Sequence, residues 1–143
     1  MAIQQSIVTL VWSAADPAAA PSGAVLPFNN VPDTADLQAL PLPYTGTVVG
    51  IAVVGKPASG DTLTVTPQLC TSPAGAGATN VASLATTISN GTPAASTFVS
   101  KDQGDAQFSS GYLQLSYTTT TSGTYTARDL VVIVYISTGR EDI

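Results

Sequence analysis

Residues 130–136 read LVVIVYI and residues 47–54 read TVVGIAVV, so both stretches are apolar at almost every position. Each is rich in β-branched residues, which favour strands, and neither alternates between apolar and polar side chains. A strand with apolar side chains on both faces is typical of the centre of a sheet. We therefore expect two central strands, each covered by the core on one side and by a neighbouring layer or subunit on the other.

Two further runs, residues 61–69 and 112–118, alternate with a period of two. Each places leucine, valine or tyrosine on one face and threonine, serine or glutamine on the other, which is the pattern of a half-buried strand. Pro67 lies inside the first run and favours an edge position or a bulge there.

Four weaker runs complete a set of about eight expected strands: residues 7–12, 25–28, 81–88 and 95–101. Turn residues separate the runs, at positions 57–61, 72–77, 90–93, 104 and 122–123. Regularly spaced short strands predict an all-β fold, a single β-sandwich spanning residues 1–143, and most economically an eight-stranded jelly roll. A chain of 143 residues is long enough to bury a real core.

The stretch from residue 14 to residue 43 holds six of the ten prolines, a density that blocks both helix and central strand. Its apolar side chains are too many to leave in water, so we expect an ordered extended loop that wraps the sandwich or reaches a neighbour. A mobile linker is the alternative. We assign Val25, Leu26, Phe28 and Leu37 as candidate interface residues. The competing interpretation is that they cover one end of the chain's own core.

Charged residues number 13, or 9% of the chain, where an ordinary domain has roughly 25%. The net charge is −5 and the four Lys and Arg residues lie far apart, which argues against binding to nucleic acid. Seven residues is the longest strictly apolar run, well short of the ~20 that a membrane helix needs. Residues 1–12 contain no Lys or Arg, so we expect no secretory signal. We expect synthesis in a cytoplasm and a final place in an assembly.

Histidine is absent, which excludes Ser-His-Asp and Cys-His catalysis and the usual zinc sites. We expect no enzymatic activity, no cofactor and no bound metal. Asp102 and Asp105 form one tight acidic turn that could bind Ca²⁺, although a calcium site normally gathers six to eight oxygens. A solvated turn between strands is the favoured interpretation.

Other candidate groups have structural interpretations that we favour. Asp33 and Asp36 could pair as in a glycosidase, but a helix cap accounts for them more simply. The single cysteine, Cys70, is expected to be a small buried hydrophobe. An exposed sugar-stacking ring is conceivable at Tyr44 or Tyr125, whereas the aromatic residues within strand patterns are expected to fill the core or an interface: Trp12, Tyr117 and Tyr135.

Four segments together resemble the β-sandwich modules of tailed-phage surface proteins, a class that includes capsid decoration (cement) proteins and head or tail fibre domains. They are PYTGTVVGIAV at 43–53, GDTLTV at 60–65, FSSGYLQL at 108–115 and RDLVVIVYI at 128–136. Many such modules carry Gly-Asp before the penultimate strand, where this chain has Gly111 and Tyr112.

The resemblance implies a structural role on a virion surface. Decoration proteins sit as oligomers, often trimers, on the lattice of the major capsid protein and brace it against the pressure of the packaged DNA. The partners implied are therefore the major capsid protein and further copies of the chain. The alternative is a fibre module, or a sandwich that binds a receptor or glycan.

Overall fold

The computed structural model describes residues 6–14, 24–26, 39–57, 60–120 and 130–138. Long strands within these ranges are β1 (Ile7–Ala14), β4 (Gly46–Val54), β5 (Thr62–Cys70), β10 (Gly111–Thr119) and β11 (Leu130–Thr138). Short strands are β2 (Ala24–Val25), β3 (Leu40–Leu42), β6 (Thr79–Asn80), β7 (Thr86–Ser89), β8 (Ala94–Phe98) and β9 (Gln107–Phe108). Two 3-10 turns are η2 (Ala82–Leu84) and η3 (Gly104–Ala106). In this part of the chain, no helix has the length and apolar character needed to cross a membrane.

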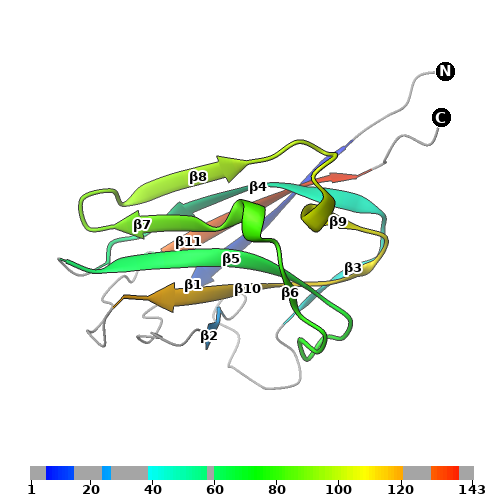
Figure 1. Ribbon diagram of the computed structural model, residues 1–143, viewed down its shortest axis with the longest axis horizontal. Coiled ribbons are helices and arrows are strands. Elements are labelled where there is room, and N and C mark those ends of the chain that lie inside the picture. The colour runs from blue at the N-terminus through cyan, green and yellow to red at the C-terminus, as the bar shows by residue number, and fades with distance from the viewer. Residues whose placement is uncertain (1–5, 15–23, 27–38, 58–59, 121–129, 139–143) are drawn as a thin grey trace.

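Two antiparallel sheets pack against each other, and Figure 1 shows them as two layers. Sheet A has the order β1-β11-β4-β8, with β9 paired to the beginning of β4. Sheet B has the order β2-β10-β5-β6, with β3 also paired to β10 and β7 also paired to β5. The prediction of a β-sandwich is confirmed.

The strand order is that of a jelly roll. The eleven strands described above correspond to the eight strand positions of a jelly roll, numbered in chain order. β2 and β3 together form position 2, because both pair with β10, and β6 and β7 together form position 5, because both pair with β5. β9 is an additional short strand. Sheet A then joins positions 1, 8, 3 and 6, and sheet B joins positions 2, 7, 4 and 5. This nested antiparallel arrangement is the double Greek key of jelly rolls.

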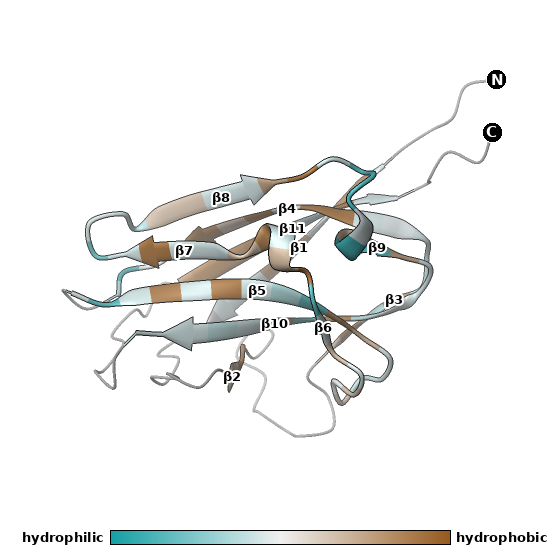
Figure 2. Cartoon of the chain, viewed as in Figure 1, coloured by the Kyte–Doolittle hydropathy of each residue, from teal (hydrophilic) through white to brown (hydrophobic). Residues whose placement is uncertain are grey.

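The inward faces of the two sheets form one hydrophobic core. Its largest fully buried side chains come from both sheets and from η2: Trp12, Leu26, Leu42, Val48, Ile51, Leu63, Leu84, Ile88, Leu113, Leu115, Leu130 and Ile136. Full burial of one such side chain stabilises the fold by about 1.5–3 kcal/mol. The alternation behind this burial is visible along β5, where Figure 2 shows hydrophobic and paler bands in turn. Trp12 and Tyr117 are buried in the core, as expected of aromatics in strand patterns.

The two fully apolar stretches form β4 and β11, which lie side by side at the centre of sheet A. The prediction that both stretches form central strands is confirmed, and the layer or subunit expected on their outer side stays a prediction. Their pairing runs through eight residue pairs and slips once, between Tyr135 and Ile136, where Val49 is the extra residue of a bulge. The edge strands β1 and β8 then attach to the two sides of this central pair.

Pro67 lies within an interior strand rather than an edge strand. Its partner across the sheet is Leu115 of β10, and on the other side its carbonyl oxygen accepts a hydrogen bond from Val81 N at 2.8 Å. That side of β5 pairs with β7 up to Val65 and with β6 from Gln68 onward. The proline therefore occupies the interruption between two short partner strands, where its missing N–H leaves no ladder bond unmade.

The prediction of one strand over residues 81–88 is correct for residues 86–88 and wrong for residues 81–85. Residues 82–84 form η2, and β7 begins only at Thr86. Val81 and Leu84 are both fully buried, and Leu84 N bonds to Val81 O at 3.0 Å. Apolar residues three apart fit a 3-10 turn, because side chains at i and i+3 lie on the same side of it.

The described parts of the Pro-rich segment are extended. The strands β2 and β3 both pair antiparallel with β10, through Ser116 and Tyr117 for β2 and through residues 111–113 for β3. Pro41 stands in β3, which is an edge position where a proline is tolerated. Residues 15–23 and 27–38 of the segment lie outside the described residues.

Substitution of Gly46 tests the close approach of β4 and β11, and Gly91 provides the control. A Cβ added at Gly46 would lie 2.6 Å from the Ser137 carbonyl oxygen and 3.2 Å from the Phe108 ring, whereas one at Gly91 would meet nothing within 4 Å. We expect Gly46→Ala to lower the melting temperature by about 3–10 °C, because backbone atoms must shift to admit the methyl group. Thermal unfolding followed by circular dichroism measures this change. An equal loss in the control variant Gly91→Ala would contradict the explanation.

Candidate interaction surface

The outward face of sheet A is formed by alternate residues of four paired strands. The register places them in rows across the sheet, so that Thr9, Tyr135, Gly50 and Phe98 form one row. We call this surface the outer A face. Its residues are Ile7, Thr9, Val11 and Ser13 of β1; Val131, Ile133 and Tyr135 of β11; Gly50, Ala52 and Val54 of β4; and Ala94, Ser96 and Phe98 of β8.

The outer A face is mainly apolar and carries no charged side chain, although Thr9, Ser13, Ser96 and Tyr135 add hydroxyl groups to it. The four large hydrophobic side chains that are exposed in the described chain all lie on it: Ile7 at 60%, Val11 at 43%, Val54 at 49% and Phe98 at 62%. Scattered exposed hydrophobics are normal on a protein, but their collection on one face marks an interaction surface.

An aromatic pair covers one end of this face. The rings of Phe98 and Tyr135 lie 5.6 Å apart between centroids at an interplanar angle of 37°, and both lean over Gly50. A Cβ at Gly50 would collide with the Phe98 ring and lie 3.3 Å from Tyr135 Cδ2. The absence of a side chain at Gly50 thus lets both rings pack against the backbone of the sheet, so the surface is flat at this end.

The outward face of sheet B has the opposite character. Threonine, serine and amide side chains cover it and bond to one another across the strands: Thr64 Oγ1 to Thr87 Oγ1 at 2.7 Å, Gln114 Nε2 to Gln68 Oε1 at 2.7 Å, and Gln68 Nε2 to Asn80 Oδ1 at 2.7 Å. Thr64, Thr87, Gln68 and Asn80 are at least partly exposed to water, whereas Gln114 is buried and bonds to Gln68. The sandwich therefore presents one polar face and one apolar face.

Of the four residues assigned to an interface from the sequence, the structure describes two, Val25 and Leu26, and neither is part of the outer A face. Val25 is half-buried in β2 opposite Ser116, and Leu26 is fully buried in the chain's own core with its N–H bonded to Leu115 O at 2.8 Å. For Leu26 the structure favours the competing interpretation, that it covers the core. Phe28 and Leu37 lie outside the described residues.

Sequence reasoning expected a neighbouring layer or subunit on the second face of the two central strands, but it assigned no residue of the outer A face as a site. The expectation came from residues 47–54 and 130–136, which are apolar on both faces although only one face of a strand can point to the chain's own core. Their second face includes Ala52, Val54 and Ile133. The edge strands add Val11 and Phe98, which no periodic run singled out.

The acidic turn is a structural clip. The Asp105 carboxylate accepts hydrogen bonds from Ser83 N at 3.0 Å and from Ser83 Oγ at 2.8 Å, and so ties η3 to η2. The bond from the Ser83 backbone is the largest cause that holds the pKa of Asp105 below its ordinary value, against a smaller opposing effect of burial. Asp102 lies on the same turn, with its N–H bonded to Ser100 Oγ at 3.3 Å. Among the described residues, no three His, Cys, Asp or Glu side chains gather as a metal site would require.

The other candidate groups are placed as follows. Cys70 is buried at the end of β5, and burial raises the pKa of its thiol, as fits a small hydrophobe rather than a nucleophile. Tyr44 is partly buried against Phe108, with ring centroids 5.9 Å apart, and is not an open stacking platform. Asp33, Asp36 and Tyr125 lie outside the described residues.

No protein-family model matches the sequence, and no curated protein matches it either. Solved structures do share the fold. A chain in the structure of infectious bursal disease virus, Gx strain, aligns over 98% of this chain with a TM-score of 0.55 and 10% identity. This chain covers 34% of the length of that viral chain. At this identity the likeness concerns the fold, and the resemblance to tailed-phage surface proteins depends on the sequence motifs alone.

The clip at Asp105 predicts a pH-dependent contribution to stability. Because its pKa is lowered in the folded state, the contribution is complete above the ordinary pKa of 3.8 and disappears as the pH falls through the lower folded value. We expect Asp105→Ala to lower the melting temperature by about 2–4 °C at neutral pH, with the difference from the unsubstituted protein vanishing in acid.

The control for this prediction is Asp102→Ala, which leaves both bonds to Ser83 in place. We expect the melting temperatures of the unsubstituted protein and of both variants to be unaffected by millimolar Ca²⁺ or by EDTA. A calcium-dependent rise in melting temperature that both substitutions abolish would make the turn a calcium site instead.

Proposed function

We propose that this protein is a virion structural protein of the capsid decoration class, which binds the lattice of the major capsid protein and stabilises the head. The observation that carries the proposal is the outer A face, a mainly apolar and uncharged surface, in contrast to the hydroxyls and amides along the outer side of sheet B. Large exposed hydrophobic side chains collected on one uncharged face favour a partner that covers them.

The fold supports a virion role. Jelly rolls are a recurrent architecture of viral capsid domains, and the solved structures similar to this chain include a chain of a virus. The sequence segments that resemble tailed-phage surface proteins correspond to β4, β5, β10 and β11, which form the centres of the two sheets. Together these likenesses support attachment to a shell of repeated subunits.

The charge distribution supports extensive protein contact. No charged residue lies in any strand that the structure describes, and the charged residues of the described ranges lie in turns and loops: Lys56, Asp61, Lys101, Asp102 and Asp105. Interface cores are depleted of charge because a buried unpaired charge is costly. A partner docked on the outer A face therefore displaces water from apolar groups without desolvating a single charge. The matching surface on the capsid is itself flat, apolar and uncharged.

The size of the face favours a multivalent attachment. Four strands about 4.8 Å apart and eight residues of about 3.3 Å rise give a flat area of about 500 Å², below the roughly 800 Å² per partner of a standard interface. One copy alone would therefore bind the lattice weakly. We propose a homotrimer, made in the host cytoplasm and placed on the capsid surface, because three linked copies gain affinity through their effective concentration.

A charge placed on the outer A face tests the attachment. We expect Val54→Lys to reduce the occupancy of purified capsids by about tenfold or more, because an ammonium group would be buried without a partner. Val54 is 49% exposed, so the isolated subunit should melt within a few degrees of the unsubstituted protein. Gel densitometry of capsids bound by each protein gives the occupancy.

The matched control is Thr118→Lys, which adds the same charge to an exposed position on sheet B. We expect this variant to retain full occupancy. Equal binding by both lysine variants would contradict a role for the outer A face in attachment.

The oligomeric state has its own test. We expect sedimentation equilibrium at micromolar concentration to give the mass of three 14.4 kDa chains. A stable monomer would contradict the trimer. In that case the occupancy of capsids by Val54→Lys would still decide whether a monomer attaches through the outer A face.

A fibre module or a receptor-binding module is the second candidate function, since both use β-sandwiches. Copy number distinguishes them. A lattice protein is present in purified virions in proportion to the major capsid protein, whereas a fibre or tail-tip module is present in a few copies. The outer A face favours the lattice role, because it is broad and flat rather than confined to the loops at one end of the sandwich.

A further inference from the structure

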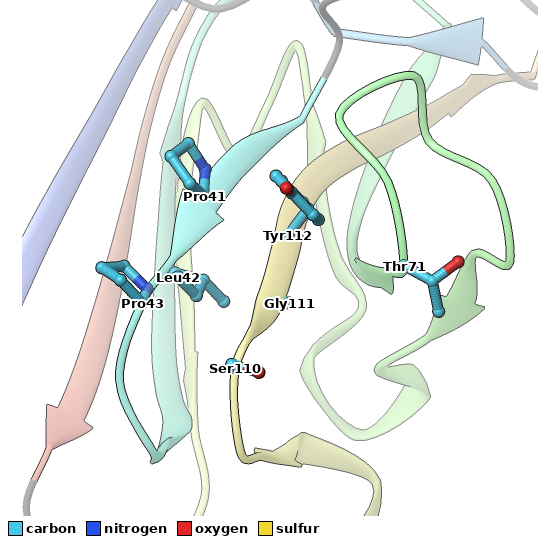
Figure 3. Close-up of a pocket in the computed structure, with 7 residues that line it drawn as sticks. All are labelled: Pro41, Leu42, Pro43, Thr71, Ser110, Gly111 and Tyr112. Carbon is cyan, nitrogen blue, oxygen red and sulfur yellow. The ribbon is translucent and has the colours of Figure 1, made fainter.

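A pocket of about 310 Å³ lies on sheet B where β10 begins, away from the outer A face. Figure 3 shows its walls: the rings of Pro41 and Pro43 on one side, Thr71 on the other, and the Tyr112 ring between them. The remaining lining residues are Leu42, Ser110 and Gly111. The pocket is therefore built from β3, the residue after β5, and the start of β10.

The lining is neutral and mixes rings with hydroxyls. None of the seven lining residues is charged. Two proline rings and one tyrosine ring offer flat apolar surfaces, and the side chains of Thr71, Ser110 and Tyr112 offer hydroxyl groups. Such a lining cannot neutralise a phosphate or a carboxylate, and it cannot pair with a cation.

The walls are held in place before any ligand arrives. Tyr112 is paired in the sheet with Pro41 on one side and with Cys70 on the other. The Thr71 N–H and hydroxyl both bond to Ala76 O, at 2.9 and 3.0 Å, which closes the loop behind the threonine. A site whose groups are already fixed loses little conformational entropy on binding.

The backbone at the rim of the pocket is strained. Ser110 has φ of +117° and Gly111 has φ of +142°, and both values lie in the region that favours glycine. Gly111 meets this requirement, but Ser110 adopts it at an energetic cost. Residues held in such conformations gather at ligand sites, and here the strain keeps a hydroxyl at the mouth of the pocket where a glycine would be the relaxed choice.

We propose that this pocket binds one ring of a neutral sugar. The apolar face of a pyranose packs on an aromatic ring, here that of Tyr112, while the Ser110 hydroxyl exchanges hydrogen bonds with the ring hydroxyls. Thr71 Oγ1 donates its proton to Ala76 O and can only accept a hydrogen bond from the sugar. The volume lies at the lower end of the 300–1,000 Å³ typical of ligand pockets, which fits one ring. A proline-rich peptide needs a groove that continues at about 3.1 Å per residue, and this pocket is a single concavity.

The proposal goes beyond the structural role proposed above and does not depend on it. A single neutral pocket binds weakly, with a dissociation constant on the order of 10 mM, because few hydrogen bonds form and no charge assists them. Many copies of the chain on one particle would convert this weak contact into firm attachment to a surface dense in glycans.

Amide chemical shifts measured by NMR test the site directly. The probes are methyl α-D-glucopyranoside and methyl β-D-galactopyranoside, with glucose 6-phosphate and a polyproline peptide as comparisons. We expect at least one neutral glycoside to shift the amides of Thr71, Ser110, Gly111 and Tyr112 in a saturable manner, with that of Ile133 on sheet A unchanged. Absence of saturable shifts with both glycosides would overturn the proposal. So would stronger binding of the phosphate or the peptide.

Two variants separate binding from folding. We expect Tyr112→Ala to weaken glycoside binding by about tenfold or more, with Tyr135→Ala on the opposite sheet as the matched control. Ser110→Gly should raise the melting temperature by about 2–4 °C through relief of strain and yet weaken binding, a combination that a purely structural serine would not produce. Unchanged binding in Ser110→Gly and Tyr112→Ala would overturn the site. Capsid occupancy of Tyr112→Ala and Ser110→Gly should stay unchanged, because neither residue lies on the outer A face, so failure of the sugar site is distinguishable from failure of capsid attachment.

Discussion

The antiparallel pairing of β4 with β11 is the interaction on which the other parts of the structure depend. It joins chain positions more than 70 residues apart through eight residue pairs, and both edge strands of sheet A attach to it. Its inward side chains, among them Ile51 and Ile136, are fully buried and form the floor of the core. Its outward side chains form the centre of the outer A face. The same two strands therefore provide the apolar burial that folds the chain and the apolar surface that a partner would cover.

With so few charged side chains, the sandwich obtains most of its polar side-chain groups from hydroxyls. Thr47 and Thr86 are buried, yet their hydroxyls donate to the carbonyl oxygens of Lys101 and Leu84 at 2.8 and 3.0 Å. A buried hydroxyl that is hydrogen-bonded costs little, whereas a buried charge needs a partner and further bonds. Threonine also favours strands, so it supplies polarity without disturbing the sheet. This explains how a chain with 9% charged residues folds with hydroxyl and amide groups along the outer side of β5, β7 and β10.

Much of this fold follows from periodicity, and the exceptions have physical causes. Alternation identified β5 and β10, and unbroken apolar runs identified β4 and β11, because nine-residue strands repeat the pattern several times. Strands of two or three residues, such as β3, contain no full repeat and depend on their partner in the sheet. Val81 and Leu84 fit a strand and a 3-10 turn equally well until the burial of both is known. The outer A face was harder to predict from the sequence. An apolar residue such as Val54 contributes the same letter to the pattern whether its side chain faces the core, a partner or water.

The two surfaces proposed to bind partners belong to different sheets, and the jelly roll keeps them apart. The outer A face looks away from the core on one side, while Pro41 and Tyr112 stand on sheet B beside its hydroxyl-covered face. A subunit seated on a capsid through sheet A would therefore turn its polar sheet and the sugar pocket toward the solvent. The outer A face binds best to a flat protein surface that excludes water, whereas the pocket must stay open to small neutral ligands. Because the core lies between the two surfaces, a change at Ser110 or Tyr112 leaves Val54 and Phe98 undisturbed, and each surface can be altered without the other.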